Sequence, residues 1–247
     1  MIKEALQWIV DLREPKLQEI MAEDGNRRTF SDKPLYMVEP EYHMADPINM
    51  STLSSLVDYI KANIDEMYDR MIIHVVSPTK VRLYSRLNEV RRREYLVDVD
   101  AEVPAFKFDT FIENERFIIG VQSKFMDDPD SNKDLVLKFA GTVESGTVAQ
   151  YSDDGISQKA TVKTGIASKG EALVPSPVSL RPFRTFVEVE QPVSDFVFRM
   201  KEDKYDGIQC AIIEADGGAW KNSAMKNIKD YLESELSEFM DMFTVIS

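Results

Sequence analysis

Cysteine is nearly absent from this 247-residue chain, in which Cys210 is the only one. A single thiol excludes an intrachain disulfide and any metal site that needs several thiolates. Cys210 lies in the apolar segment IQCAII, a context that predicts a buried and unreactive thiol. Histidine is also scarce, because the chain has only His43, in a polar segment, and His74, in the apolar stretch MIIHVV. Neither has the neighbours that zinc-ligand spacing requires, and we expect His74 to serve the structure.

The sequence motifs of common catalytic and nucleotide-binding loops are missing too. Neither GxSxG, GxxxxGK[ST] nor GxGxxG occurs. Carboxylates are plentiful, and a magnesium-dependent nuclease would need such groups: Asp127, Asp128, Asp130, Asp153, Asp154, Glu214 and Asp216. Turn chemistry and solvated surface explain them better, because the strand that follows Pro129-Asp130 has Val136 where a nuclease motif needs an acid. We therefore expect no catalytic residues, no metal and no cofactor, and the sequence favours a protein that is not an enzyme.

Positive charge is in deficit, since the net charge at pH 7 is −13. A protein that coats nucleic-acid phosphates usually has the opposite sign, so the overall charge disfavours this class of partner. No apolar run approaches the roughly 20 residues that cross a bilayer. The N-terminal segment carries Glu4 and Asp11 and lacks the features of a signal peptide. We expect a cytoplasmic protein with no membrane partner.

The remaining composition is that of a globular protein, with 43% hydrophobic and 30% charged residues. We expect one domain, 1–247, with a possible weak subdivision into 1–108 and 109–247. Apolar periodicity predicts the following elements in the first half: a helix at 2–13, a hairpin within 17–36, a helix at 52–66, strands at 71–76, 80–87 and 94–100, and a helix at 109–125. Thr110 and Glu113 have the spacing of a capping box at the start of this last helix.

The second half reads mostly as strands between 134 and 200, followed by a strand at 207–215. A long amphipathic helix closes the chain from Ala219 to about Met240. The hairpins are grouped and do not alternate with helices. The order of elements therefore predicts an α+β fold with mostly antiparallel sheet and about four helices.

One segment reverses the overall charge. It contains Lys80, Arg82, Arg86, Arg91, Arg92 and Arg93. These cations are candidates for contact with phosphates or with an acidic protein partner. The alternative, which we favour, is that they pair internally with Glu89, Glu94 and Asp98 or are simply solvated.

Arginine and phenylalanine also alternate in LRPFRTFVEVEQPVSDFVFRM, residues 180–200. As a strand, 179–190 would place Phe183, Thr185, Val187 and Val189 on one face and Arg184, Phe186, Glu188 and Glu190 on the other. The glutamates on the arginine face oppose phosphate binding, so we favour a structural role over stacking on nucleic acid. Pro182 lacks an N–H and indicates an edge strand. Edge strands pair with other chains, which makes Arg181, Pro182, Arg184 and Phe186 a candidate interface.

Four segments carry a resemblance to known proteins: FIENERFIIGVQSKF, SDDGISQKATVKTGIA, VPSPVSLRPFRTFVEVEQPVSDFVFRM and EADGGAWKNSAMKNIKDYL. Their order resembles that in a family of early-region proteins of Firmicutes bacteriophages and prophages. The chain is more distantly similar to the enterobacterial prophage YfdQ-like family. The resemblance implies a phage origin and a place in the cytoplasm of the host bacterium. It brings no catalytic residues.

Three functions remain open. The first is a non-enzymatic phage accessory protein that self-assembles and binds a host or phage protein, with inhibition of a host defence system as one possible outcome. The second is a DNA replication or recombination accessory protein that contacts DNA through the arginine-rich segment. The third is a structural, self-assembling phage protein. We expect a homo-oligomer in the first and third cases.

Overall fold

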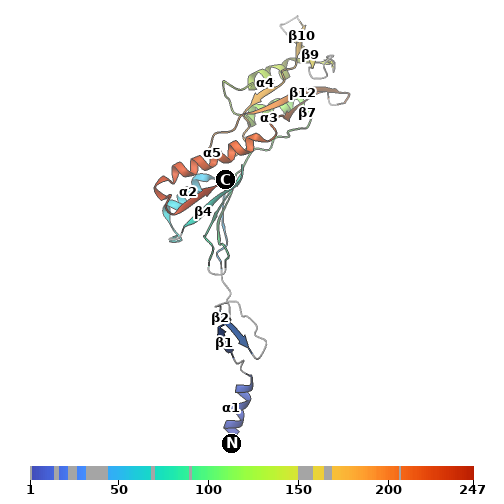
Figure 1. The fold of residues 1–247 in the computed structure, drawn as a ribbon. Coiled ribbons are helices and arrows are strands. Elements are labelled where there is room, and N and C mark those ends of the chain that lie inside the picture. The colour runs from blue at the N-terminus through green and yellow to red at the C-terminus, as the bar shows by residue number, and fades with distance from the viewer. Residues whose placement is uncertain are drawn as a thin grey trace. The chain divides into compact units, whose positions relative to one another are not determined.

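The computed structural model describes residues 2–13, 17–21, 27–31, 44–67, 70–88, 91–149, 158–163, 169–205 and 207–247. Contacts within the chain divide it into two compact units, Met1–Met44 and Ala45–Ser247, which we describe separately (Figure 1). His43 and the acidic pair Asp153-Asp154 lie outside the described residues.

The first unit contains helix α1 (Ile2–Arg13) and the antiparallel strands β1 (Leu17–Met21) and β2 (Arg27–Ser31). The helix and both arms of the hairpin were predicted and are confirmed, while the turn at 24–26 lies outside the described residues. The large apolar side chains described in this unit are all exposed: Ile2, Leu6, Trp8, Ile9, Leu17, Ile20, Met21, Phe30 and Met44. The described part of this unit therefore has no hydrophobic core of its own.

The second unit begins with a sheet of five strands in the order β14-β4-β5-β6-β3. Its strands are β3 (Ile48–Met50), β4 (Met71–Ser77), β5 (Lys80–Tyr84), β6 (Tyr95–Asp100) and β14 (Phe243–Ile246). The outer strands β14 and β3 pair in parallel and the inner pairs are antiparallel. The predicted strands at 71–76, 80–87 and 94–100 are confirmed within a few residues, whereas the short edge strands β3 and β14 were not foreseen.

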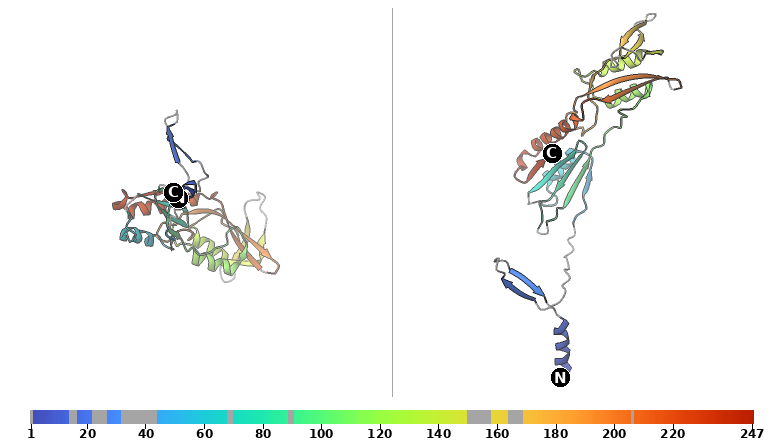
Figure 2. Two further views of the ribbon diagram at one scale, coloured as in Figure 1. Left: turned by 90° about the horizontal axis from the view of Figure 1, so that it is seen from below. Right: turned by 45° about the vertical axis from the view of Figure 1, so that its right-hand side comes forward.

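Helices α2 (Leu53–Ala62) and α5 (Ala219–Glu235) cover one face of this sheet (Figures 1 and 2). Every second residue of β4 faces them, which buries Met71, Ile73 and Val75. Thr52 caps α2 by accepting a hydrogen bond from the Ser55 N–H at 3.2 Å. Helix α5 buries Ala224, Ile228 and Leu232, one residue per turn. Together these side chains form the first hydrophobic core.

A second core lies on a four-stranded antiparallel sheet in the order β11-β12-β13-β7. Its elements are β7 (Ile112–Glu113), α3 (Asn114–Lys124), α4 (Lys133–Thr142), β11 (Val178–Leu180), β12 (Ser194–Asp203) and β13 (Gly207–Glu214). Beside them, β8 (Val143–Ala149), β9 (Lys159–Lys163) and β10 (Lys169–Leu173) make a three-stranded sheet in the order β10-β9-β8. The chain passes from the first core to the second near residue 108, but Phe186, Val189, α5 and β14 return to the first core, so the two cores do not follow the expected subdivision into 1–108 and 109–247.

The fold is therefore α+β with mostly antiparallel sheets, as predicted, but the described residues contain five α-helices where about four were expected. The additional one is α4, because 134–143 was predicted to be a strand. Val136 and Ala140 are buried one helical turn apart, while Leu135 is 47% exposed. The apolar residues of this segment fit both the strand period and the helix period, and packing against the second core selects the helix.

Helix boundaries also differ from prediction, and α2 ends at Ala62 instead of near residue 66. Glu113 is not the third residue of a capping box but is itself the N-cap of α3, since its carboxylate accepts hydrogen bonds from the backbone N–H groups of Glu115 and Arg116. The closing helix is 17 residues long and ends at Glu235, before the predicted end near Met240. A short 3₁₀ helix, η1 (Ser237–Phe239), and strand β14 follow it.

Candidate functional site

The face of the five-stranded sheet opposite α2 and α5 carries the candidate site. Strand pairing aligns its side chains in two rows across the sheet. One row contains Thr244, Ile72, Tyr84 and Tyr95, and the next contains Ile246, His74, Arg82 and Asp98. Tyr95 and Ile246 are clearly exposed and the other strand residues in these rows are at least partly so. This face therefore presents a mixed aromatic, aliphatic and charged surface.

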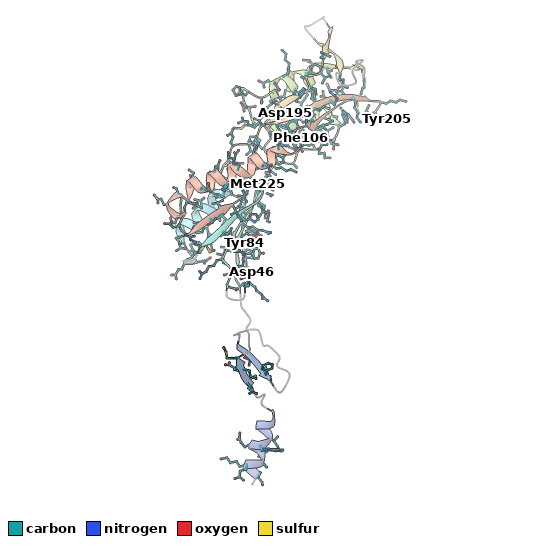
Figure 3. All side chains as sticks on the ribbon, in the orientation of Figure 1. Asp46, Tyr84, Phe106, Asp195, Tyr205 and Met225 are labelled. Carbon is teal, nitrogen blue, oxygen red and sulfur yellow. The ribbon has the colours of Figure 1, made fainter. Side chains whose placement is uncertain are left out.

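Three aromatic side chains of this face contact one another. The ring centroids of Tyr84 and Tyr95 lie 4.9 Å apart in an edge-to-face arrangement, and those of His74 and Tyr84 lie 6.1 Å apart. Tyr84 is labelled on the sheet in Figure 3. His74 was expected to be a structural residue of an apolar strand, yet it lies on the outward face and is only partly buried. Tyr95 is exposed and the other two rings are partly exposed, and such rings offer flat surfaces on which the ring of a ligand can stack.

The two tyrosines mark the base of an arginine-rich connection, residues 85–94, which we call the arginine hairpin. Strand β5 ends at Tyr84 and β6 begins at Tyr95. Backbone hydrogen bonds from Ser85 to Glu94 and from Asn88 to Arg92 close the hairpin at 3.0 and 2.9 Å. Its cations are Arg86, Arg91, Arg92 and Arg93, of which the first three are exposed and the last is half-buried. The fold thus brings together aromatic rings and arginines that the sequence did not suggest as a set.

Arg82 and Lys80, the two cations of the segment that lie on β5, form ion pairs within the sheet. The Nε of Arg82 lies 2.6 Å from an Asp98 oxygen, and Lys80 lies 2.8 Å from Asp100. Hydrogen bonds with Tyr84 and with Asp98 hold the pKa of the Arg82 guanidinium above its usual value. The carboxylate of Glu94 accepts a hydrogen bond from the Ala45 N–H at 2.8 Å. Ion pairs therefore hold Lys80 and Arg82 on the strand β5, and the other arginines of the segment lie in the hairpin.

The second candidate segment, which begins at Arg181, does not form the predicted strand. Strand β11 ends at Leu180 at the edge of its sheet, an isolated antiparallel bridge then joins Pro182 to Phe125, and residues 184–186 are buried. The side chain of Gln191 explains why. Its oxygen accepts hydrogen bonds from the N–H groups of Arg184 and Thr185, and its nitrogen donates to the carbonyl of Phe186. One buried glutamine thus satisfies backbone groups that a neighbouring strand would otherwise have to satisfy.

The proposed interface residues of this segment lie mostly inside the fold. Phe186 is 1% exposed in the first core, and Pro182 and Arg184 are buried. Arg181 keeps some exposure and lies 2.9 Å from Asp128 and 3.1 Å from Glu190. The burial of Phe186 and Arg184 disfavours a contact surface with another chain at this segment. The predicted interface stays a prediction.

Arg184 is held by both charge and aromatic stacking. Its Nη1 lies 2.6 Å from a Glu214 oxygen, and its guanidinium carbon lies 3.8 Å from the centre of the Trp220 ring. Its Nη2 also donates to the hydroxyl of Ser194. Burial lowers the pKa of Arg184 to about 10, although Glu214 opposes this shift. Arg184 therefore joins its own loop to the end of β13 and the start of α5, and its role is structural.

Other side chains that could serve catalysis or metal binding have structural partners. Asp127 pairs with the buried Lys133 at 2.6 Å, and Asp216 accepts a hydrogen bond from the Gly218 N–H before α5. Among the described residues, no group of three or more His, Cys, Asp or Glu side chains is placed to hold a metal ion. Cys210 is buried as predicted, and burial, followed by the charge of Glu113, raises the pKa of its thiol to about 12. No helix in the described part is long and apolar enough to cross a membrane.

Sequence reasoning missed the aromatic half of the candidate site. The signal was present, since one tyrosine lies within a predicted strand and the other near the start of the next, with arginines between them. What was not visible was that the two tyrosines share the outward face. Comparisons with protein-family models, curated proteins and solved structures find no match to this chain.

Proposed function

We propose that this protein is a non-enzymatic binding protein whose open sheet face and arginine hairpin bind single-stranded nucleic acid. The observation that supports this most is the Tyr84–Tyr95 pair at the base of a hairpin with four arginines. Binding of single strands requires base stacking and phosphate contacts on the same surface, and this face supplies both. An unpaired base can lie flat on a tyrosine ring, whereas the bases of a duplex are already stacked on each other.

The negative charge of the chain sets the expected strength. The hairpin arginines provide few phosphate contacts in a protein of net charge −13. Affinity should therefore be modest, with a Kd on the order of 10⁻⁵ M at physiological salt, and should fall steeply as salt rises. The excess of negative charge elsewhere should oppose non-specific binding of the strand.

The test is fluorescence anisotropy with a labelled single-stranded oligonucleotide at low and physiological salt. The variant Arg91→Gln/Arg92→Gln/Arg93→Gln removes three charges from the hairpin. The matched control Lys61→Gln/Lys226→Gln/Lys229→Gln removes three charges from α2 and α5, which cover the opposite face of the sheet. We expect the hairpin variant to weaken binding at least about tenfold and the control to have little effect.

Two results would overturn the proposal. One is the absence of any binding that is present at low salt and weakens as the salt concentration rises. The other is equal competition by heparin, a polyanion without bases, combined with equal loss in both triple variants. That pattern would reduce the interaction to attraction between net charges, with no contribution from the tyrosines.

A second candidate function is self-assembly through the first unit. Its described apolar side chains are exposed, and neither a 12-residue helix nor an isolated hairpin is stable in water by itself. We infer that α1 packs against a second copy of the chain, as the expected homo-oligomer requires. Light scattering after size exclusion should show an oligomer that Leu6→Glu weakens, while Gln7→Glu, at the adjacent position, leaves it intact. A monomer at all concentrations would rule this out.

The biological setting remains a proposal as well. A role in the cytoplasm of a phage-infected bacterium, including inhibition of a host defence system, is compatible with either kind of binding. Protection of a phage from a defence system by the expressed protein, lost in the hairpin variant, would connect the setting to the site.

A further inference from the structure

A cavity of about 640 Å³ lies beside helix α3, in the part of the second unit that contains the second core. The side chains that matter for its chemistry are Phe106, Lys107, Phe111, Glu113, Arg116 and Lys124. They come from the segment that precedes β7, from β7 itself and from α3. Cavities of this size accommodate small ligands.

The charge of the lining is opposite to that of the chain. Lys107, Arg116 and Lys124 are cationic, and Glu113 is the one carboxylate among the lining residues. That carboxylate already accepts the N–H groups of Glu115 and Arg116 at 2.9 and 3.1 Å as the cap of α3. Lys107 and Arg116 are exposed, whereas the ammonium group of Lys124 donates to the carbonyl of Ala105. A net positive cavity in a protein of charge −13 selects an anion.

The aromatic wall of the cavity is held in place by the fold. The ring of Phe106, labelled in Figure 3, packs edge-to-face on Phe125 with centroids 4.9 Å apart. A Cβ atom at Gly120 would approach this ring to 3.0 Å, so glycine at this turn of α3 leaves the space that the Phe106 ring occupies. Phe111 has the ammonium group of Lys201 4.7 Å from its ring centre. Two phenylalanine rings and several cations thus line one cavity.

We propose that this cavity binds a nucleotide, with the base against the phenylalanine rings and the phosphate near Lys107 and Arg116. A base alone would leave the cations unused, and inorganic phosphate alone would leave the aromatic wall unused. The nucleotide comes either free in solution or as one unit of a single strand. The inference does not depend on binding at the open sheet face, because the two sites share no residue.

Isothermal titration calorimetry with adenosine 5′-monophosphate tests the site on the full chain. We expect saturable binding, and binding at least about tenfold weaker for adenosine and for inorganic phosphate separately. Lys107→Gln/Arg116→Gln and, separately, Phe111→Ala should each weaken the nucleotide about tenfold or more. Lys221→Gln/Lys226→Gln on α5 removes the same charge and should not change binding, and neither should the hairpin variant Arg91→Gln/Arg92→Gln/Arg93→Gln.

The outcomes separate the possibilities. No binding of the nucleotide at millimolar concentration, or binding no tighter than that of phosphate, overturns the proposal. Full binding by Lys107→Gln/Arg116→Gln also overturns it. If a single-stranded oligonucleotide loses affinity in Lys107→Gln/Arg116→Gln, the source is a strand, and if only the mononucleotide does, the source is free nucleotide. If only the hairpin variant fails to bind the oligonucleotide, the result concerns the open sheet face. It then does not contradict nucleotide binding in this cavity.

Discussion

Two segments of this chain combine arginine with aromatic residues, and the fold exposes the arginines of one segment and buries an arginine of the other. In the arginine hairpin, the side chains of Arg86, Arg91 and Arg92 are exposed beside tyrosines. In the loop that follows β11, Arg184 and Phe186 are buried. The difference shows that interleaved arginine and aromatic residues do not by themselves mark a binding surface. Buried charge needs a fixed partner, and Arg184 has one in Glu214, thirty positions later in the chain.

The largest expected effect concerns the buried segment. Phe186→Ala should destabilise the protein by about 3–5 kcal/mol, because it removes a ring from the first core. Chemical denaturation measures this. The neighbour Val187 is 73% exposed, so Val187→Ala should change the stability by less than about 0.5 kcal/mol. Equal effects of the two variants would contradict the assignment of this segment to the core.

Arg184→Ala should cost the next largest amount, about 2–4 kcal/mol of unfolding free energy. It breaks the pair with Glu214 and removes the guanidinium that stacks on Trp220. Lys229→Ala, which breaks the exposed pair with Glu233, provides the control and should cost no more than about 0.5 kcal/mol. At a temperature where the Arg184 variant is folded, its affinity for an oligonucleotide should be unchanged. A selective loss of affinity would instead return this arginine to the candidate binding residues.

On the exposed side, Tyr95→Ala and Tyr84→Ala should each weaken oligonucleotide binding by about 1–3 kcal/mol, the contribution of one stacked base. Tyr95→Phe keeps the ring and should keep most of the affinity. Tyr205→Ala is the matched control for the loss of an exposed ring. Tyr205 is 88% exposed at the turn between β12 and β13 and is labelled in Figure 3. Binding that is insensitive to both sheet tyrosines would leave only charge attraction at this face.

The smallest effect is that of one hairpin cation. Arg91→Gln should reduce the slope of log affinity against log salt concentration by about 0.7, one phosphate contact with a single strand. Its effect on unfolding should be negligible, because Arg91 is exposed. Lys226→Gln on α5 should leave the slope unchanged. An unaltered slope in the Arg91 variant would remove this residue from the contact surface.

Much of the fold could be predicted where one period dominates. Helix α1 and the strands β4 to β6 follow from the spacing of their apolar residues, and Cys210 is buried as its context indicates. Prediction was wrong for α4, where apolar residues fit both periods. It was also wrong from Arg184 to Phe186, where Gln191 supplies the hydrogen bonds that a strand would have made. For the candidate site, the arginines could be named from the sequence, and the tyrosines could not.

By itself, the sequence determined the local elements, the single inert thiol, the acidic net charge and the absence of familiar catalytic motifs, because each is a property of neighbouring residues or of composition. The tertiary structure decided which arginines face water and which are buried, and which rings share a face with them. Those outcomes depend on partners far away along the chain. Glu214 neutralises Arg184, and cross-strand register places Tyr84 beside Tyr95.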